Sequence, residues 1–419
     1  MKISLLTLGC KVNQSESSQI AAELVAHGCS LVNLEGNPDL CIINTCSVTS
    51  KSDYQSRQLI RRAAKTGSRV IVTGCYAELN EETVKSMDGV IMVVPNNDKE
   101  CISNILYNNK SSSGLSINQD SRSRYLVKVQ DGCNNACSYC VIPKARGRSR
   151  SRKINEVISE INSIRDSYNE VVITGIHLGT YGYDLIPKVS LSTLIKTILL
   201  KTNTKRIRLS SLEVNEIDDE LIELLQEERV CKHLHIPLQS GDNKILAIMN
   251  RTYNLSQFNN ILTLLCQKLP GSSIGSDIIV GFPGEGQIEF ENTRKFIEDA
   301  SLSYVHIFPF SPRKGTRASE MKPQVNSLVK KERCEILRLI GKRKKSEYMH
   351  TQIGKVLDLL IEEIGDEGRA CTGTTGNYLK VWAYLENPRP KDVVYVGISG
   401  VKDETLIGHP IEPTQAVVK

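Results

Sequence analysis

Short apolar segments alternate with helical stretches along most of this chain, and this alternation restricts the folds open to it. The pattern runs from residue 124 to about residue 350 and predicts a final helix over residues 327–347. We expect strands over residues 125–130, 170–174, 206–210, 233–238, 273–280 and 304–310. Strands separated by helices form parallel sheets with right-handed crossovers. Six such units predict an α/β fold, an incomplete (β/α)6 barrel related to the TIM barrel, with its chemistry at the carboxyl ends of the strands.

The first part of the chain repeats the alternation in a separate parallel α/β sheet. Apolar segments over residues 2–10, 40–46 and 69–75 each end in a cysteine, and helical patterns over residues 14–27 and 52–65 separate them. Because the carboxyl ends of parallel strands share one edge, Cys10, Cys46 and Cys75 should converge there. Glycine precedes two of them and allows close backbone approach. The pattern predicts a metal site of three thiolates; the alternative is three small buried hydrophobic residues.

Three further cysteines, Cys133, Cys137 and Cys140, lie on one short loop. Thiolates suit zinc or iron–sulfur clusters, but a closed zinc site and an electron-transfer cluster both require four ligands. Three thiolates can hold a 4Fe–4S cluster and leave one iron open. The loop therefore predicts a cluster that binds a further ligand, and the alternative is a set of buried or zinc-binding thiols.

Small and polar residues follow the expected barrel strands, where they would leave room for a cofactor and supply hydrogen bonds. The candidates for cofactor binding are Tyr139, Gly175, Ser211, Glu213, His235 and Gln239. At each strand exit the alternative is an ordinary turn. His235 and Asp277 lie inside strands and can equally be core groups with satisfied hydrogen bonds.

The last part of the chain, from residue 350, changes character. Short alternating segments over residues 354–362, 378–384, 392–398 and 405–408 predict a small antiparallel β-barrel. The aromatic residues Tyr378, Trp382 and Tyr384 lie near Lys380 and Arg369, as a surface that stacks RNA bases requires. The alternative is that these aromatic side chains form the core of the barrel.

Composition and charge narrow the class of protein. The 419 residues carry a net charge of +6, and residues 144–153 hold six positive charges without an acidic residue. Residues 330–345 hold eight positive charges against two glutamates, so both runs predict contact with phosphates. The sequence shows no membrane span and no signal peptide, which predicts a cytoplasmic protein. Thirteen cysteines in such a chain indicate metal or redox chemistry and not disulfides.

Four motifs together resemble a known enzyme family. They are Leu8-Gly-Cys-Lys-Val-Asn-Gln14, Asp131-Gly-Cys-Asn-Asn-Ala-Cys-Ser-Tyr-Cys140, Thr174-Gly-Ile-His-Leu-Gly-Thr-Tyr-Gly182 and His306-Ile-Phe-Pro-Phe-Ser-Pro-Arg-Lys-Gly-Thr316. The whole chain looks like a radical S-adenosylmethionine (SAM) methylthiotransferase, of the branch that modifies threonylcarbamoyladenosine at tRNA position 37. Related branches usually follow the first cysteine with Gln-Met-Asn or Pro-Lys-Asn, and Lys11-Val12-Asn13 matches neither. Residues 286–288 depart from the usual pattern at a helix start.

The resemblance implies an N-terminal domain over residues 1–107, a linker over 108–122, a radical core over 123–349 and an RNA-binding TRAM barrel, similar to an OB fold, over 350–419. It implies two 4Fe–4S clusters. The cluster on Cys133, Cys137 and Cys140 would cleave SAM, and an auxiliary cluster on Cys10, Cys46 and Cys75 would hold the sulfur. A second SAM would methylate that sulfur, and the methylthio group would go to C2 of the adenine. Both open irons should then face one cavity.

Several alternatives and partners follow from the same resemblance. The reaction could instead act on isopentenyladenosine at tRNA position 37 or on a ribosomal protein. A different class of protein, a non-catalytic RNA-binding iron–sulfur redox sensor, fits the two three-cysteine sites less well, because open irons suit substrate binding. The expected partners are a tRNA anticodon stem-loop, an electron donor and a sulfur source, with no membrane.

Overall fold

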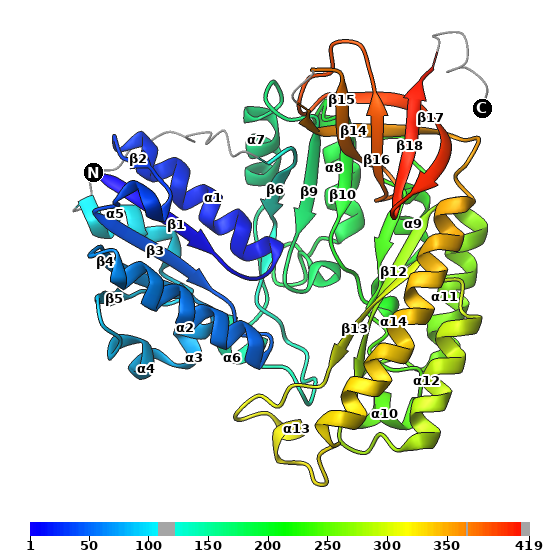
Figure 1. Cartoon of the computed structure of the whole chain (residues 1–419), viewed down its shortest axis with the longest axis horizontal. Coiled ribbons are helices and arrows are strands. Elements are labelled where there is room, and N and C mark those ends of the chain that lie inside the picture. The colour runs from blue at the N-terminus through cyan, green and yellow to red at the C-terminus, as the bar shows by residue number, and fades with distance from the viewer. Residues whose placement is uncertain (108–121, 366–367, 412–419) are drawn as a thin grey trace.

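The computed structural model of the chain describes residues 1–107, 122–365 and 368–411 (Figure 1). The predicted linker over residues 108–122 lies outside the described residues except for its last position. Three parts follow one another along the chain: a parallel sheet with helices, a curved core of strands and helices, and a small β-barrel. The predicted order of architectures is confirmed.

The N-terminal part is a five-stranded parallel sheet with strand order β2-β1-β3-β4-β5. The strands are β1 (Lys2–Thr7), β2 (Ser30–Leu31), β3 (Leu40–Thr45), β4 (Arg69–Gly74) and β5 (Val90–Val93). The helices are α1 (Lys11–Ala26), α2 (Ser50–Lys65), α3 (Cys75–Leu79), α4 (Glu81–Lys85) and α5 (Ile102–Tyr107). The three strands that lead to cysteines are confirmed. The pattern does not reveal β2 and β5, because these edge strands are short and partly exposed.

The core contains the six predicted strands in chain order, as two parallel sheets, β6-β9-β10 and β11-β12-β13. These strands are β6 (Tyr125–Lys128), β9 (Glu170–Thr174), β10 (Arg206–Leu209), β11 (His233–His235), β12 (Ser273–Val280) and β13 (Tyr304–Pro309). Strand β6 continues into β7 (Gln130–Asp131), which forms an antiparallel pair with β8 (Arg150–Ser151). Strands β10 and β11 do not pair along their length. They are connected by an isolated bridge between Ile207 and Val230 and by a hydrogen bond of 3.0 Å from the Leu212 amide to the His235 carbonyl.

Helices cover the outer face of these strands, as Figure 1 shows. They are α7 (Ile154–Ser163), α8 (Leu191–Lys201), α9 (Asp219–Leu225), α10 (Asn243–Ile248), α11 (Leu255–Lys268), α12 (Gln287–Asp299) and α14 (Ser327–His350). Alternate strand residues such as Ile173 and Ile278 are fully buried beneath the helices, together with Leu194 and Phe258. The other set of alternate residues, including Glu170 and Asp277, faces the inside of the curve, where polar side chains gather.

The C-terminal part is a closed five-stranded barrel with order β14-β15-β16-β18-β17. Its strands are β14 (Val356–Ile364), β15 (Ala370–Thr375), β16 (Lys380–Tyr384), β17 (Val393–Lys402) and β18 (Thr405–Pro410). The expectation of a wholly antiparallel barrel is wrong, because β16 and β18 pair in parallel to close it. The alternation predicted for β16 is confirmed: Val381 and Ala383 are buried, and the residues between them are exposed.

The two outer parts contact the core at different places. Helix α1 packs along β6, where the Ser15 hydroxyl donates to the Leu126 carbonyl at 2.9 Å. At the carboxyl end of β13, Arg313 donates to Asp53 of α2 at 2.6 Å. The C-terminal barrel covers the amino end of β10, where Arg208 donates to carbonyls of that barrel. Among the described residues, every helix is too short or too polar to cross a lipid bilayer.

Candidate active site

The loop between β7 and α6 (Ile142–Arg146) carries Cys133, Cys137 and Cys140, and all three thiols are free and partly exposed. Backbone amides already point at two of the sulfurs: that of Asn135 at the Cys133 sulfur and that of Ile142 at the Cys140 sulfur, both at 3.4 Å. Burial and the neighbouring thiols Cys137 and Cys133 raise the pKa of Cys140 to about 12. The positively charged iron of a cluster stabilises such neighbouring sulfurs as thiolates. The three cysteines therefore fit a 4Fe–4S cluster. We call these three residues the radical site.

Two side chains that the sequence analysis does not single out contact the radical site. His177 lies 3.5 Å from the Cys133 sulfur through Nδ1, and its Nε2 lies 2.5 Å from Glu216. Burial alone would lower the pKa of His177, but Cys133 and Glu216 outweigh it and raise that pKa to about 10. Arg251 donates to the Cys137 sulfur at 3.2 Å. His177 follows a strand exit, which is a usable signal, whereas Arg251 comes from a turn after α10 that has no local signature.

The predicted cofactor-binding residues divide into those beside the radical site and those farther away. Glu213 forms an ion pair with Arg251, and Arg251 also donates to the Tyr139 hydroxyl at 3.4 Å. Gly175 packs against Gln130, whose amide donates to the Asp131 and Gly132 carbonyls at the start of the cysteine loop. The structure therefore brings Tyr139, Gly175 and Glu213 close to the cysteines.

The remaining candidates are His235, Ser211 and Gln239. Ser211 is exposed just beyond β10. Gln239 adopts a positive φ of 70°, and its backbone forms hydrogen bonds with β12 on both sides. His235 belongs to a cluster on the inside of the curve, where Asp277 lies 3.1 Å from His235 and 3.3 Å from His306. Burial would raise the pKa of Asp277, but hydrogen bonds from both histidines lower it to about 2.

The second triad, Cys10, Cys46 and Cys75, lies where the strands β1, β3 and β4 end, and we call it the auxiliary site. A Cβ on Gly9 would lie 3.0 Å from the Cys46 sulfur, so the loop before Cys10 passes directly over Cys46. Burial raises the pKa of Cys46, and the neighbouring Cys75 and Cys10 thiols raise it further. The predicted convergence of the three cysteines is therefore confirmed, and the donor set again fits a cluster with one open iron.

Asn13 holds two of the auxiliary loops together. Its side-chain amide donates to the Leu8 carbonyl at 2.7 Å and to the Thr45 carbonyl at 3.0 Å. The Thr45 carbonyl lies immediately before Cys46, and the Leu8 carbonyl lies two residues before Cys10. Because Asn13 is 1% exposed, both hydrogen bonds are shielded from water.

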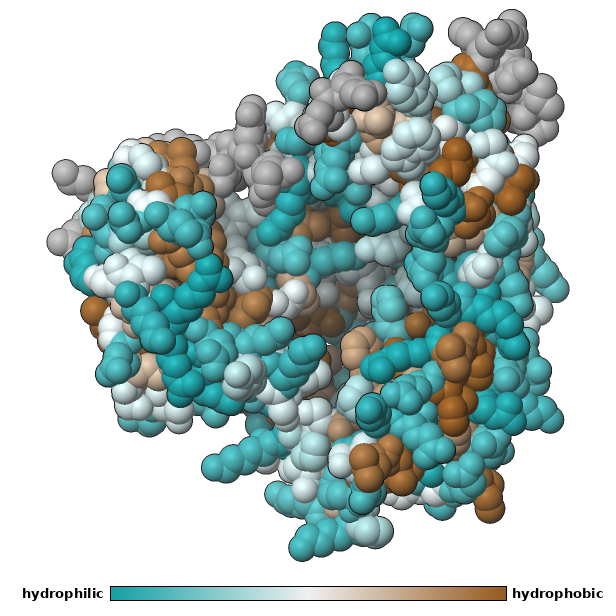
Figure 2. All heavy atoms as spheres, in the orientation of Figure 1, coloured by the Kyte–Doolittle hydropathy of each residue, from teal (hydrophilic) through white to brown (hydrophobic). Residues whose placement is uncertain are grey.

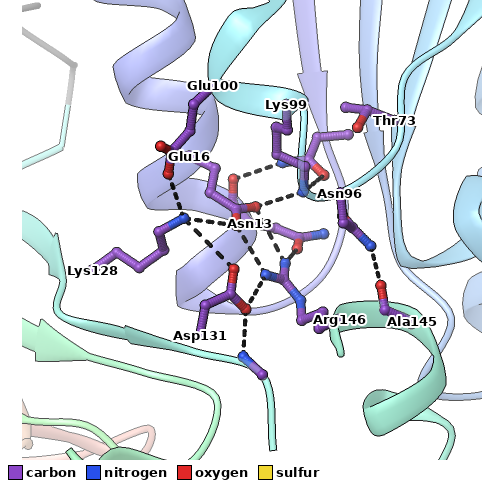
Figure 3. A network of polar contacts seen from close by, with 12 residues as sticks. Asn13, Glu16, Thr73, Asn96, Lys99, Glu100, Lys128, Asp131, Ala145 and Arg146 are labelled. Carbon is purple, nitrogen blue, oxygen red and sulfur yellow. Dashed lines mark hydrogen bonds and ion pairs between the residues drawn. The ribbon is translucent and has the colours of Figure 1, made fainter. Parts of the chain in front are cut away.

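Arg146 connects the auxiliary site with the radical site through a buried network of charges, drawn in Figure 3. Its guanidinium donates to Glu16 at 2.9 Å, to Asp131 at 2.8 Å and to the Asn13 side chain. Asp131 in turn accepts from the Gly132 amide at 2.7 Å, directly before Cys133. Lys99 completes the network through an ion pair of 2.7 Å with Glu16. One set of hydrogen bonds therefore spans both cysteine sites.

Lys11, the residue after Cys10, projects toward the inside of the curved core. Burial, Arg208 and Arg124 lower the pKa of Lys11 to about 8, and Glu170 partly opposes them. Among the described residues, no hydrogen-bond or ion-pair partner lies within bonding distance of this ammonium. Figure 2 shows the molecular face hollowed between the N-terminal part on the left and the core.

Comparison with known proteins identifies the family. Residues 127–297 match the radical SAM superfamily, and residues 2–95 match the uncharacterized protein family UPF0004. The threonylcarbamoyladenosine tRNA methylthiotransferase MtaB of Bacillus subtilis is 38% identical over 403 residues, which cover 90% of this chain and 89% of that protein. The protein of the same name from Aquifex aeolicus is 35% identical over 384 residues, which cover 87% of this chain and 93% of that protein. The chain belongs to the threonylcarbamoyladenosine tRNA methylthiotransferase family.

Solved structures show the fold of this methylthiotransferase at a greater distance. The radical SAM methyltransferase TsrM of Kitasatospora setae, with cobalamin and a 4Fe–4S cluster bound, has a TM-score of 0.57 and 13% identity, covering 76% of this chain and 77% of TsrM. At this identity the likeness establishes the fold alone. The radical SAM core of the methylthiotransferase implies SAM and a 4Fe–4S cluster as cofactors.

The two basic runs of the methylthiotransferase are expected to contact phosphates, but each contains an arginine that is buried in an ion pair. Arg146 of the first run is 1% exposed in its side chain and belongs to the network of Figure 3, so phosphate contact is wrong for this residue. In the second run, which lies on α14, Arg333 is buried against Glu285 at 2.7 Å. Local charge density cannot reveal such pairing, because the acidic partners come from distant segments.

The aromatic residues of the C-terminal barrel divide into two groups. Trp382 and Tyr384 are 41% and 44% exposed, so the alternative that they form the barrel core is wrong. Tyr378 instead stacks on His233 with ring centroids 4.3 Å apart and lies over Arg208. Tyr378 therefore contributes to the contact between the barrel and the core.

Proposed function

We propose that this protein transfers a methylthio group to C2 of N6-threonylcarbamoyladenosine at position 37 of tRNA. The observation that carries the proposal is the pairing of two three-cysteine sites across one interface. The α3 helix, which begins at Cys75, packs against α6, which begins two residues after Cys140. The family membership supports the same substrate over isopentenyladenosine or a ribosomal protein, and an RNA-modifying enzyme is expected in the cytoplasm with its tRNA.

The six cysteines have separate roles in this proposal. Cys133, Cys137 and Cys140 would hold the cluster that binds SAM, and Cys10, Cys46 and Cys75 would hold a second 4Fe–4S cluster. When bound, these groups supply the radical that activates the inert C2–H bond and the sulfur that replaces the hydrogen. An electron donor and a sulfur source are required as partners.

The other side chains of the radical site position its loop. Arg251 keeps a positive charge against Cys137 and is itself fixed by Glu213. His177 does the same for Cys133 through its contact with Glu216. These charged pairs are largely shielded from water, so they hold the thiolates in place more strongly than exposed pairs would.

Lys11 supports the choice of substrate. The threonylcarbamoyl group carries a carboxylate, whereas an isopentenyl group is apolar. Lys11 is adjacent to Cys10, and its ammonium has no bonded anion among the described residues, because the nearby Glu170 pairs with Arg124 and Arg208 instead. Burial of an ammonium without a bonded anion is unfavourable, so a substrate carboxylate would stabilise the charged form of Lys11. We assign Lys11 to recognition of that carboxylate.

The C-terminal barrel supplies a surface for the anticodon stem-loop. Trp382 and Tyr384 are exposed on the same face of β16 as Lys380. Exposed aromatic rings beside a cation are the arrangement that stacks unpaired bases.

Mass spectrometry of tRNA nucleosides tests this function in cells that lack the endogenous enzyme and express the wild type or a Cys10→Ala, Cys46→Ala, Cys75→Ala variant. We expect methylthio-threonylcarbamoyladenosine with the wild type only, and accumulation of its precursor with the variant. Loss of a different methylthiolated adenosine, with this nucleoside unchanged, would show that the substrate is wrong.

A further inference from the structure

We propose that Arg146 is a positioning residue that donates a hydrogen bond from its Nε–H to the Cys75 sulfur and so sets the reduction potential of the auxiliary cluster. The inference rests on the proposed function, because it requires a cluster at the auxiliary site.

The first observation is an incomplete set of hydrogen bonds on a buried guanidinium. The terminal nitrogens of Arg146 are fully used by Glu16, Asp131 and Asn13. The Nε–H has no hydrogen-bond partner among the described residues, although the side chain is 1% exposed. An orphaned buried donor is unfavourable, so its retention requires an acceptor.

The second observation identifies that acceptor. Cys75 is buried, and the Arg146 guanidinium is the cation that acts most strongly on its sulfur, ahead of Lys99. The α3 helix, which carries Cys75 at its first position, also packs against α6, which carries Arg146 at its last position. Once it is a cluster ligand, the Cys75 sulfur is therefore the acceptor available to the Nε–H.

The third observation is that Arg146 reaches every cysteine loop of the auxiliary site. Its contact with Asn13 connects it to the carbonyls that precede Cys10 and Cys46. Its contact with Asp131 connects it to the loop of Cys133. The same guanidinium can therefore fix the position of the auxiliary ligands relative to the radical site.

A hydrogen bond to a ligand sulfur changes the cluster in a measurable way. Hydrogen bonds and positive charge near the sulfurs favour the reduced, more negative cluster and raise its potential. Lys99 is the other buried cation near Cys75, but Glu16 and Asn44 already accept from its ammonium, at 2.7 and 3.2 Å. Lys99 keeps one further N–H, whereas the Arg146 guanidinium is held in a fixed orientation by Glu16, Asp131 and Asn13 with only its Nε–H unused.

The test uses the full chain with Cys133, Cys137 and Cys140 replaced by alanine, so that the auxiliary cluster alone is bound. Arg146→Lys and Arg146→Gln are introduced into this parent, and the cluster potential is measured by a redox titration followed by electron paramagnetic resonance. We expect both variants to lower the potential, Gln more than Lys. A tenfold change in the reduction equilibrium corresponds to about 59 mV for one electron.

The matched control is Arg333→Lys, which alters another buried arginine, one paired with Glu285 and stacked on Phe290. Its potential should equal that of the parent. If Arg146→Gln does not fold, Arg146→Lys decides alone, because lysine keeps the charge but cannot donate from the Nε position. Unchanged potential in Arg146→Lys would overturn the inference, whereas a parent that binds no iron would instead overturn the auxiliary cluster of the proposed function.

Discussion

Lys11 and Glu16 show how single residues of α1 serve different sites on one helix. Lys11 points toward the inside of the core and its cations, whereas Glu16 points into the ion network around Arg146. The first is placed to meet a substrate, and the second to hold two parts of the chain together. Their substitution should therefore affect different measurements.

Replacement of Lys11 by glutamine should reduce kcat/KM for an anticodon stem-loop that contains threonylcarbamoyladenosine. Loss of one charged hydrogen bond, about 1.5–3 kcal/mol, corresponds to roughly 10- to 150-fold. Lys11→Arg should retain most of the rate, and Lys51→Gln, an exposed change on α2, should retain all of it. Equal kcat/KM for Lys11→Gln and the wild type would show that Lys11 does not recognise the substrate.

Replacement of Glu16 by glutamine should destabilise the protein by about 3–5 kcal/mol at pH 7, because Lys99 would lose its buried anion and Arg146 would be left with Asp131. These cations hold the pKa of Glu16 well below its usual range. The stabilisation is therefore complete above the unfolded-state pKa of about 4.3 and declines as the pH falls further.

Urea unfolding of the wild type and Glu16→Gln at pH 7 and at pH 4 measures this difference. The difference in free energy of unfolding between the two proteins should be larger at pH 7 than at pH 4. Glu81→Gln, which breaks an exposed pair with Lys85, should change the free energy of unfolding by less than about 1 kcal/mol at either pH. A difference for Glu16→Gln that grows toward acid pH would contradict the assigned charge.

The ends of strands β1, β3 and β4 show what can be predicted at the scale of elements. Parallel strands must end at one edge, so the cysteines after them could be placed together from the sequence alone. Asn13 could not be given its role in the same way. Its partners, the carbonyls of Leu8 and Thr45, come together only when the sheet has formed.

Gly74, at the end of β4, should not tolerate a side chain. It has a φ of 97°, and a Cβ there would lie 2.3 Å from the Thr45 carbonyl oxygen. Gly74→Ala should therefore destabilise the protein by about 2–4 kcal/mol and lower the iron bound at the auxiliary site. Gly67→Ala is the matched control, because Gly67 has a φ of 78° but open space around it. Equal unfolding temperatures and iron contents for the two variants would contradict this account.

At the scale of the whole molecule, the sequence predicts the three architectures in order but not how they contact one another. Arg146 lies in a run that looks like a solvated basic face, yet its partners Glu16 and Asp131 come from two other segments. From the sequence alone, the aromatic residues of the C-terminal barrel allow two interpretations, an RNA-binding surface or the core of the barrel. Alternation along β16 fixes which residues share a face, but not which face points inward.

Trp382→Ala should weaken binding of the anticodon stem-loop by about 1–3 kcal/mol, the contribution of one stacked base. Tyr395→Ala is the control, because Tyr395 is also an exposed aromatic residue of the barrel but faces a cavity lined by Arg206 and Asp358. Fluorescence anisotropy with labelled stem-loop measures both. Equal affinity of Trp382→Ala and the wild type would show that the RNA-binding surface lies elsewhere.

The central claim, that two three-cysteine sites serve one reaction, is tested most directly by iron analysis combined with product formation. After anaerobic reconstitution, the wild type should bind about eight irons, four for each cluster, and convert a stem-loop with threonylcarbamoyladenosine to its methylthio product. Variants with either triad replaced by alanine should bind about four irons and form no product. Product formation by a variant that lacks Cys10, Cys46 and Cys75 would contradict the account.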